Sequence, residues 1–129
     1  MILPHMLWDA ENHDKIVRLN RIQLLDCLLR YDADIDQAYY GTTALSQAIM
    51  LRDHLVATWL LEHGANPDSM NGRGQTPVHF AAQDGWLTGL ELMKPKGASL
   101  DVRDNFMRTP LVMAAGNGHS RCVQFFIQN

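Results

Sequence analysis

Histidine is the residue type in this chain best suited to chemistry, because its ring can bind a metal or transfer a proton near neutral pH. No two of the six histidines stand four residues apart on one predicted helix with a third ligand at a spacing typical of metal sites. His13-Asp14 and His119-Ser120 are chain neighbours, whereas a nucleophile and its base are normally brought together by the fold. We therefore expect no catalytic residue, no metal site and no cofactor. The six histidines are His5, His13, His54, His63, His79 and His119.

Composition favours a single domain with a packed interior. The chain has 129 residues, of which 47% are hydrophobic, and a formal net charge of −3. This charge has the wrong sign for a phosphate-binding surface, so no nucleic-acid partner is expected. No apolar run approaches the ~20 residues that a membrane-spanning helix needs, and the first residues lack the pattern of a signal peptide. The two cysteines, Cys27 and Cys122, are far apart and fit reduced thiols. These features predict a soluble intracellular protein, cytoplasmic or nuclear, without membrane contact.

A repeat of 33 residues organises the chain. Thr43, Thr76 and Thr109 recur at this interval, and so do the turn residues Ala65 and Ala98. Repeats of 20 to 50 residues are typical of solenoid proteins, in which each unit packs on the next. The agreement between two independent positions predicts such a solenoid.

Each part of the repeat has a physical role that the third unit illustrates. Thr76 can act as the N-cap of a first helix, and Pro77 suits its first turn, where no amide donor is required. Ala81 and Ala82 let this helix lie close to neighbouring helices. Gly85 then ends the helix, since glycine adopts the left-handed conformation at little cost. A second helix and a turn-rich loop of about ten residues follow, and this length predicts a projecting hairpin-like loop.

The segment Thr76-Pro-Val-His-Phe-Ala-Ala and the pair Gly118-His119 resemble the sequence pattern of the ankyrin repeat. The resemblance implies an all-α solenoid of about four helix-turn-helix units with short projecting hairpin loops. The whole chain, 1–129, would form one domain. Its parts would be a degenerate N-terminal capping unit at about 1–36 and repeats at about 37–69, 70–102 and 103–129, the last of them incomplete.

Several polar residues are expected to support this fold. The resemblance implies that His79 ties neighbouring loops together by hydrogen bonds. Asp36, Asp68 and Asp101 each stand three residues after a turn alanine or its equivalent, and we expect each carboxylate to bind backbone amides of its own loop.

The third unit departs from the pattern in its second helix. Gly89 takes a position that is usually aliphatic, and Pro95 falls in the last turn. Glycine and proline both disfavour helix, so we expect this helix, at about residues 87–94, to be the weakest of the stack.

The resemblance implies recognition of another protein, of unknown identity, through the loop tips and the concave face of the first helices. Aromatic and arginine side chains, which are favoured at binding hot spots, occur among the corresponding positions. An assembly or spacer role through the apolar C-terminal helix stays open, as does an enzyme on an unusual ankyrin scaffold, although no catalytic motif supports it. The candidate partner-binding residues are Tyr39, Tyr40, Thr42, Gln47, Met50, Arg73, Gln75, Phe80, Gln83, Asp84, Asn105, Phe106, Arg108, Met113 and Asn117.

Overall fold

The computed structural model describes residues 23, 26, 34–38 and 41–129. The chain divides into two compact units, Met1–Asp34 and Ile35–Asn129. In the first unit only Gln23, Asp26 and Asp34 are described, so most of the predicted capping unit lies outside the described residues. The predicted contacts Tyr39 and Tyr40 lie outside them as well.

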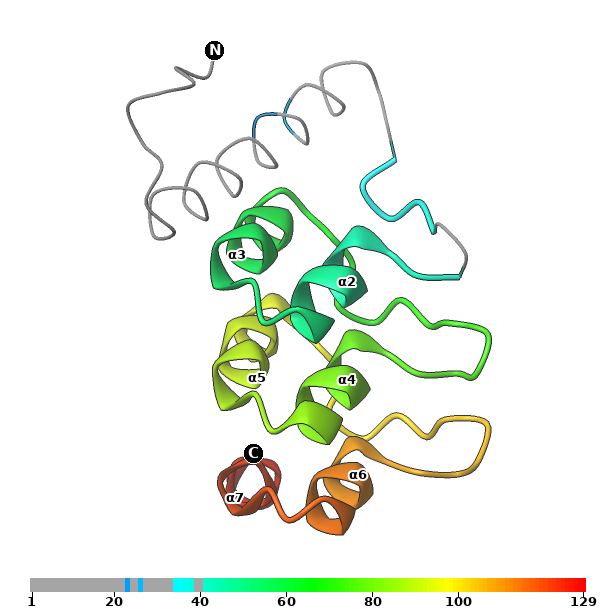
Figure 1. Cartoon of the computed structure of the whole chain (residues 1–129), viewed down its shortest axis with the longest axis vertical. Helices are drawn as coiled ribbons and strands as arrows, with labels where there is room; N and C mark the ends of the chain where they lie inside the picture. The colour runs from blue at the N-terminus through cyan, green and yellow to red at the C-terminus, as the bar shows by residue number, and fades with distance from the viewer. Residues whose placement is uncertain (1–22, 24–25, 27–33, 39–40) are drawn as a thin grey trace, which may run out of the picture. The chain divides into compact units, whose positions relative to one another are not determined.

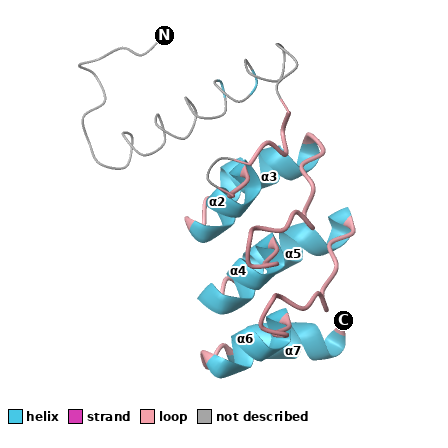
Figure 2. Cartoon of the chain, turned by 90° about the vertical axis from the view of Figure 1, so that its right-hand side faces the viewer, coloured by secondary structure: helices cyan, strands magenta, loops and turns pink. Residues whose placement is uncertain are grey.

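The second unit consists of three helix pairs and, within the described ranges, contains no strand (Figures 1 and 2). The first helices of the pairs, α2, α4 and α6, lie one below another in one layer, and the second helices, α3, α5 and α7, form the other layer. The all-helical repeat fold predicted from the sequence is therefore confirmed. No helix in the described part of the chain is long and apolar enough to cross a membrane. The bounds are α2 Ala44–Met50, α3 His54–Glu62, α4 Pro77–Asp84, α5 Leu87–Met93 followed by the 3₁₀ turn η1 Lys94–Lys96, α6 Pro110–Gly116 and α7 Ser120–Gln128.

The first helices begin at the predicted threonine caps. The Thr43 hydroxyl accepts a hydrogen bond from the backbone N–H of Ser46 at 3.2 Å. The Thr109 hydroxyl accepts one from the N–H of Val112 at 3.3 Å. These bonds satisfy amides that have no partner inside the helix, which is the role of an N-cap.

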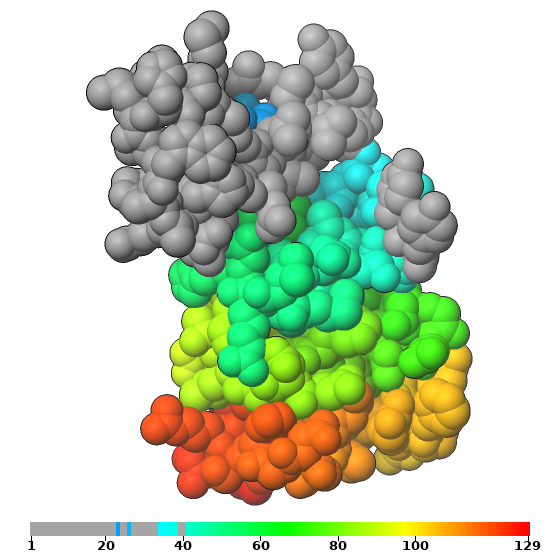
Figure 3. All heavy atoms as spheres, viewed as in Figure 1, coloured from blue at the N-terminus to red at the C-terminus, as the bar shows by residue number. Residues whose placement is uncertain are grey.

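The core lies between the two helix layers of the second unit. The first and second helices contribute buried apolar side chains such as Ile49, Leu60 and Leu90. Ala81 and Ala82 are also fully buried, and α4 packs against both α2 and α6, as the small-residue pair predicts. In the space-filling view the helix pairs form successive bands in contact with one another (Figure 3). Each fully buried leucine side chain stabilises the fold by about 2 kcal/mol.

A free cysteine, Cys122, is buried in this core. Burial raises the pKa of its thiol, because the charged thiolate is disfavoured away from water. Cys27 lies outside the described residues.

The third unit accommodates its two unusual residues in different ways. α5 ends at Met93, and Pro95 lies in the 3₁₀ turn that follows. Gly89 is buried, and a Cβ atom added there would lie 2.5 Å from Cε3 of Trp86. The Trp86 ring therefore occupies the space that an aliphatic side chain at position 89 would fill.

Two of the recurring aspartates bind the turn of the following unit. Oδ1 of Asp36 accepts a hydrogen bond from the backbone N–H of Asn66 at 2.8 Å. Oδ1 of Asp68 accepts one from the N–H of Ser99 at 2.8 Å. The expectation that the carboxylate binds amides of its own loop was wrong for Asp68, because stacking brings the turn of the following unit beside it. The aspartates connect units to one another.

Candidate functional site

A groove of about 460 Å³ runs along the first helices and the loops that precede them. α2, α4 and the loops that lead into α4 and α6 supply its walls. Every described residue that lines it is among the partner contacts predicted from the sequence. These lining residues are Met50, Arg73, Gln75, Phe80, Gln83, Asp84 and Arg108.

The other predicted contacts lie outside this groove. Thr42 is half-buried, and the remaining exposed positions are on α2, at the loop tip before α6 and just after α6. Met113 is 7% exposed and belongs to the core, although it is the α6 equivalent of Phe80. It therefore offers almost no surface to a partner. The exposed positions are Gln47, Asn105, Phe106 and Asn117.

Two side chains shape the hairpin loops that carry the groove arginines. Oδ1 of Asn71 accepts hydrogen bonds from the backbone N–H groups of Arg73 at 2.9 Å and Gln75 at 3.0 Å. One repeat later, Oδ1 of Asp104 accepts them from Phe106 at 2.9 Å and Arg108 at 2.8 Å. Such local bonds favour a tight turn over helix or strand. The hairpin-like loops predicted from the sequence thus have a defined cause.

The two loops are also joined to each other. The backbone N–H of Asn105 donates to the carbonyl of Arg73 at 2.8 Å, and its side-chain amide donates to the carbonyl of Gly72 at 3.1 Å. Gly74 has a φ of 73°, and an added Cβ there would lie 2.7 Å from Oδ1 of Asn105. Only glycine allows this close approach in this backbone conformation. The loop tips are therefore fixed relative to one another.

Arg108 is neutralised by a buried carboxylate. Its Nε and Nη2 both lie 3.0 Å from Oδ2 of Asp104, which is 3% exposed, and its guanidinium carbon lies 5.0 Å from the centre of the Phe106 ring. Burial by itself would raise the pKa of Asp104. Hydrogen bonds from the backbone of Arg108 and Phe106 and from the side chains of Arg108 and Gln75 outweigh burial and hold this pKa below its usual value. The carboxylate is therefore ionised at neutral pH.

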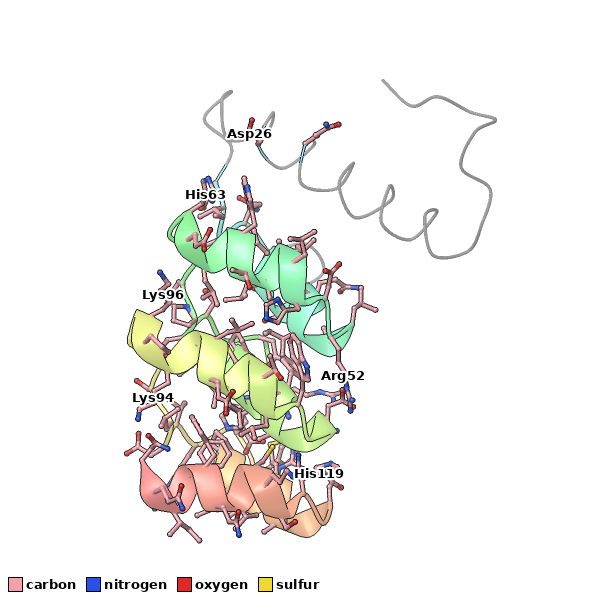
Figure 4. All side chains as sticks on the ribbon, turned by 90° about the vertical axis from the view of Figure 1, so that its left-hand side faces the viewer. Asp26, Arg52, His63, Lys94, Lys96 and His119 are labelled. Atoms are coloured by element: carbon pink, nitrogen blue, oxygen red, sulfur yellow. The ribbon has the colours of Figure 1, made fainter. Side chains whose placement is uncertain are left out.

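Asp84 at the other side of the groove is also paired. Nε of Arg52 lies 2.6 Å from Oδ2 of Asp84, and Nη2 donates to the Asp84 carbonyl at 2.6 Å. At the next junction, Nε2 of His119 lies 2.9 Å from the carbonyl of Gln83. Figure 4 labels Arg52 and His119 along the same edge of the helix pairs, the edge where first helices turn into second helices. Both contacts join one unit to the next.

Sequence reasoning did not single out Arg52 or Asp104, although the repeat contains a signal for each. Arg52 stands one period before Gly85, and it adopts the same left-handed backbone conformation with a φ of 53°. Asp104 stands one period after Asn71. Comparison of equivalent positions would have marked both residues as unusual.

His79 has the structural role that the resemblance implies. Its side chain is fully buried. Nδ1 lies 3.1 Å from the backbone nitrogen of Thr76, and Nε2 lies 3.0 Å from the carbonyl oxygen of Arg108. The amide of Thr76 can only donate and the carbonyl can only accept, so Nδ1 is the acceptor and Nε2 carries the proton. The predicted link to the neighbouring loop is confirmed.

The groove combines polar and aromatic side chains. Its described lining presents an aromatic ring, a thioether, two amide side chains, two guanidinium groups and one carboxylate, a composition that also occurs at protein interfaces. Within the described ranges, no three His, Cys, Asp or Glu side chains are grouped so that they would hold a metal ion.

Comparison with known proteins agrees with the repeat. The family model for ankyrin repeats (3 copies) matches residues 52–129. Cyclin-dependent kinase inhibitor 2A of Monodelphis domestica is 38% identical over 87 residues, which are 67% of this chain and 50% of that protein. Human cyclin-dependent kinase 4 inhibitor B is 41% identical over 81 residues, 62% of this chain and 58% of that protein. The chain therefore spans about half the length of these two relatives.

A third relative has a different activity in its name. Glycerophosphocholine phosphodiesterase GDE1 of Candida albicans is 36% identical over 109 residues, but these are 80% of this chain and only 9% of that protein. The similarity thus covers a small part of a much larger chain. The family model, the 33-residue period and the three helix pairs agree, and the chain belongs to the ankyrin-repeat family.

Proposed function

We propose that this chain is a protein-binding module that recognises its partner in the groove and on the adjoining loop tip, and that it is not an enzyme. One observation carries the proposal: candidate contacts from three successive units line a single groove, including Met50, Phe80 and Arg108. Phe80 is in α4, lines the groove and is half-buried. Aromatic and arginine side chains in such positions often dominate binding energy.

The relatives suggest the first partner class to test. Two of them are named as inhibitors of cyclin-dependent kinases. We propose a protein kinase of this class as the partner and an intracellular site of action, in the cytoplasm or the nucleus.

The test compares Phe80→Ala with Leu55→Ala. Phe80 lines the groove, whereas Leu55 is an exposed apolar residue of α3, in the other helix layer. Binding of the purified chain to cyclin-dependent kinase 4 is measured by calorimetry. We expect Phe80→Ala to weaken binding by about 2 kcal/mol or more and to leave Tm nearly unchanged, while Leu55→Ala changes neither.

Two results would contradict the proposal in different ways. If the kinase does not bind but another protein binds through Phe80, the proposed partner class is wrong and the proposal of a protein-binding module is kept. If every partner found binds Phe80→Ala as well as it binds the original chain, the groove is not the partner-binding site.

Exposed apolar side chains favour one alternative, self-association through the C-terminal helix. Ile127 in α7 and Val112 in α6 are largely exposed. Sedimentation of the purified chain tests this directly. A dimer that Ile127→Asp dissociates would support the assembly role over the groove.

A further inference from the structure

We propose that the groove binds an extended acidic segment of the partner protein, with one carboxylate paired to Arg73 and a neighbouring apolar side chain placed on Phe80 and Met50. This inference rests on the proposed function and adds the chemistry of the partner. It follows from the charges of the groove, taken one at a time.

Four of the five charged side chains that the structure describes in or beside the groove are paired with one another. Arg108 forms a pair with the buried carboxylate of Asp104. Asp84 forms a pair with Arg52. The two glutamine side chains of the groove are neutral, and that of Gln75 is held by Asn71 and Asp104.

Arg73 is the charge that stays uncompensated. Its backbone is fixed by Asn71 and by the neighbouring loop, so the side chain begins from a rigid position. Its guanidinium group is exposed and has no hydrogen-bond or ion-pair partner among the residues that the structure describes. An arginine offers five N–H donors in a planar fork that matches a carboxylate. Among the residues that the structure describes, the groove therefore carries one positive charge without a partner, beside an apolar surface.

The apolar part of the groove defines the second half of the ligand. Phe80 is half-buried and Met50 is 40% exposed. Together they suit one leucine-sized or aromatic side chain, since methionine adapts its shape to a partner and the aromatic ring supplies contact area. An acidic residue next to an apolar residue is thus the complementary sequence. In the described part of the groove a nucleic acid would meet a single unpaired cation, which is too little for a phosphate backbone.

A random dodecapeptide library displayed on phage provides the probe. It is selected on the purified chain and, in parallel, on Arg73→Glu. We expect the original chain to enrich peptides with Asp or Glu next to an apolar residue, and Arg73→Glu to enrich Lys or Arg instead. The best acidic peptide is then synthesised with a fluorescent label, and its affinity is measured by anisotropy at two salt concentrations.

Three variants decide the outcome. Arg73→Gln should weaken the acidic peptide about tenfold, with the loss largest at low salt. Arg121→Gln removes an exposed arginine from α7, in the other helix layer, and should leave affinity unchanged. Phe80→Ala should weaken binding of the peptide both in the original chain and in the chain that carries Arg73→Gln.

The failures of the two proposals are distinguishable. The acidic-segment inference is overturned if the selected peptides need Phe80 but show no preference for acidic residues, or if Arg73→Glu selects the same peptides. In either case the groove is still the proposed binding site. If Phe80→Ala binds the selected peptides unchanged, the groove itself is excluded. Binding of a labelled single-stranded RNA that Arg73→Gln abolishes would also overturn the inference.

Discussion

His79 and Val112 stand one repeat apart, at the same position of α4 and α6. Both follow a Thr-Pro pair, and both lie in the first turn of a helix. Yet the His79 side chain is 0% exposed and the Val112 side chain is 53% exposed. The loop before α6 covers His79 through the carbonyl of Arg108. No described residue covers Val112 in the same way.

The contrast separates two kinds of information in a repeat protein. The helix start depends on residues within a few positions, so both units form it. Burial of the third helix residue depends on the next unit along the stack, because each unit contacts mainly its neighbours. The same side-chain position therefore has a structural role in one unit and none in the next.

The largest effect is expected at His79. His79→Ala removes a buried ring and leaves the amide of Thr76 and the carbonyl of Arg108 without their partner, so we expect a loss of about 2 kcal/mol in the free energy of unfolding. Val112→Ala is the matched control and should cost less than ~0.5 kcal/mol, because that side chain is exposed. Urea unfolding measures both. Equal losses would break the comparison.

A second pair of variants compares two helix glycines that differ in their surroundings. Gly89→Ala places a methyl group against the Trp86 ring and should destabilise the chain by about 1–2 kcal/mol. Gly116→Ala in α6 meets no atom within 4 Å and should stabilise it by ~0.5–1 kcal/mol. Thermal unfolding gives the sign for each. If Gly89→Ala stabilised the chain, the Trp86 ring would be able to move aside at little cost.

The difference between α5 and α3 can be tested without mutation. The Asp53 side chain caps α3 by accepting from the N–H of Val56, whereas Trp86 provides no such bond at the start of α5. With Pro95 just beyond its end, α5 should open more easily by ~1 kcal/mol, so its amides should exchange with solvent about fivefold faster. Hydrogen exchange measured by NMR checks this. Slower exchange in α5 would contradict the expected weakness of the third unit.

Met107 offers a smaller effect in the loop before α6. It has a φ of 63° and stands one period after Gly74, which has a φ of 73°. A left-handed backbone is costly for methionine, so Met107→Gly should stabilise the chain by ~0.5–1 kcal/mol after the added freedom of the unfolded chain is counted. The Tm of the variant decides. A lower Tm would mean that the exposed methionine makes contacts that outweigh the backbone strain.

A change that depends on pH is expected for Asp104→Asn, which keeps the shape of the side chain but removes its charge. The pKa of Asp104 is lower in the folded protein, so its ionised form contributes stability above the unfolded value of about 3.9. This contribution disappears as the pH falls through the folded pKa. The Tm of the original chain should therefore exceed that of Asp104→Asn at pH 7, and the two should converge as the pH falls through the folded pKa of Asp104. A constant gap would show that the charge is not the cause.

Part of the groove could be predicted from the sequence. The 33-residue period places Arg73 and Phe106 at equivalent positions of neighbouring loops. It did not reveal which positions would share one groove, nor that Met113 would be buried while its equivalent Phe80 lines the groove. Those outcomes depend on how each side chain packs against the neighbouring unit.

The sequence by itself determined the helices, their threonine caps, their glycine ends and the family, because each of these depends on residues a few positions apart or on exact repetition of type. Only the tertiary structure decided the contacts between units. Asp68 binds the amide of Ser99, Arg52 binds Asp84, and Asp104 binds Arg108 in a buried pair. These partners are specified by distance and orientation in space. That Arg73 has no partner among the described residues can be recognised only after the partners of the other charged side chains are known.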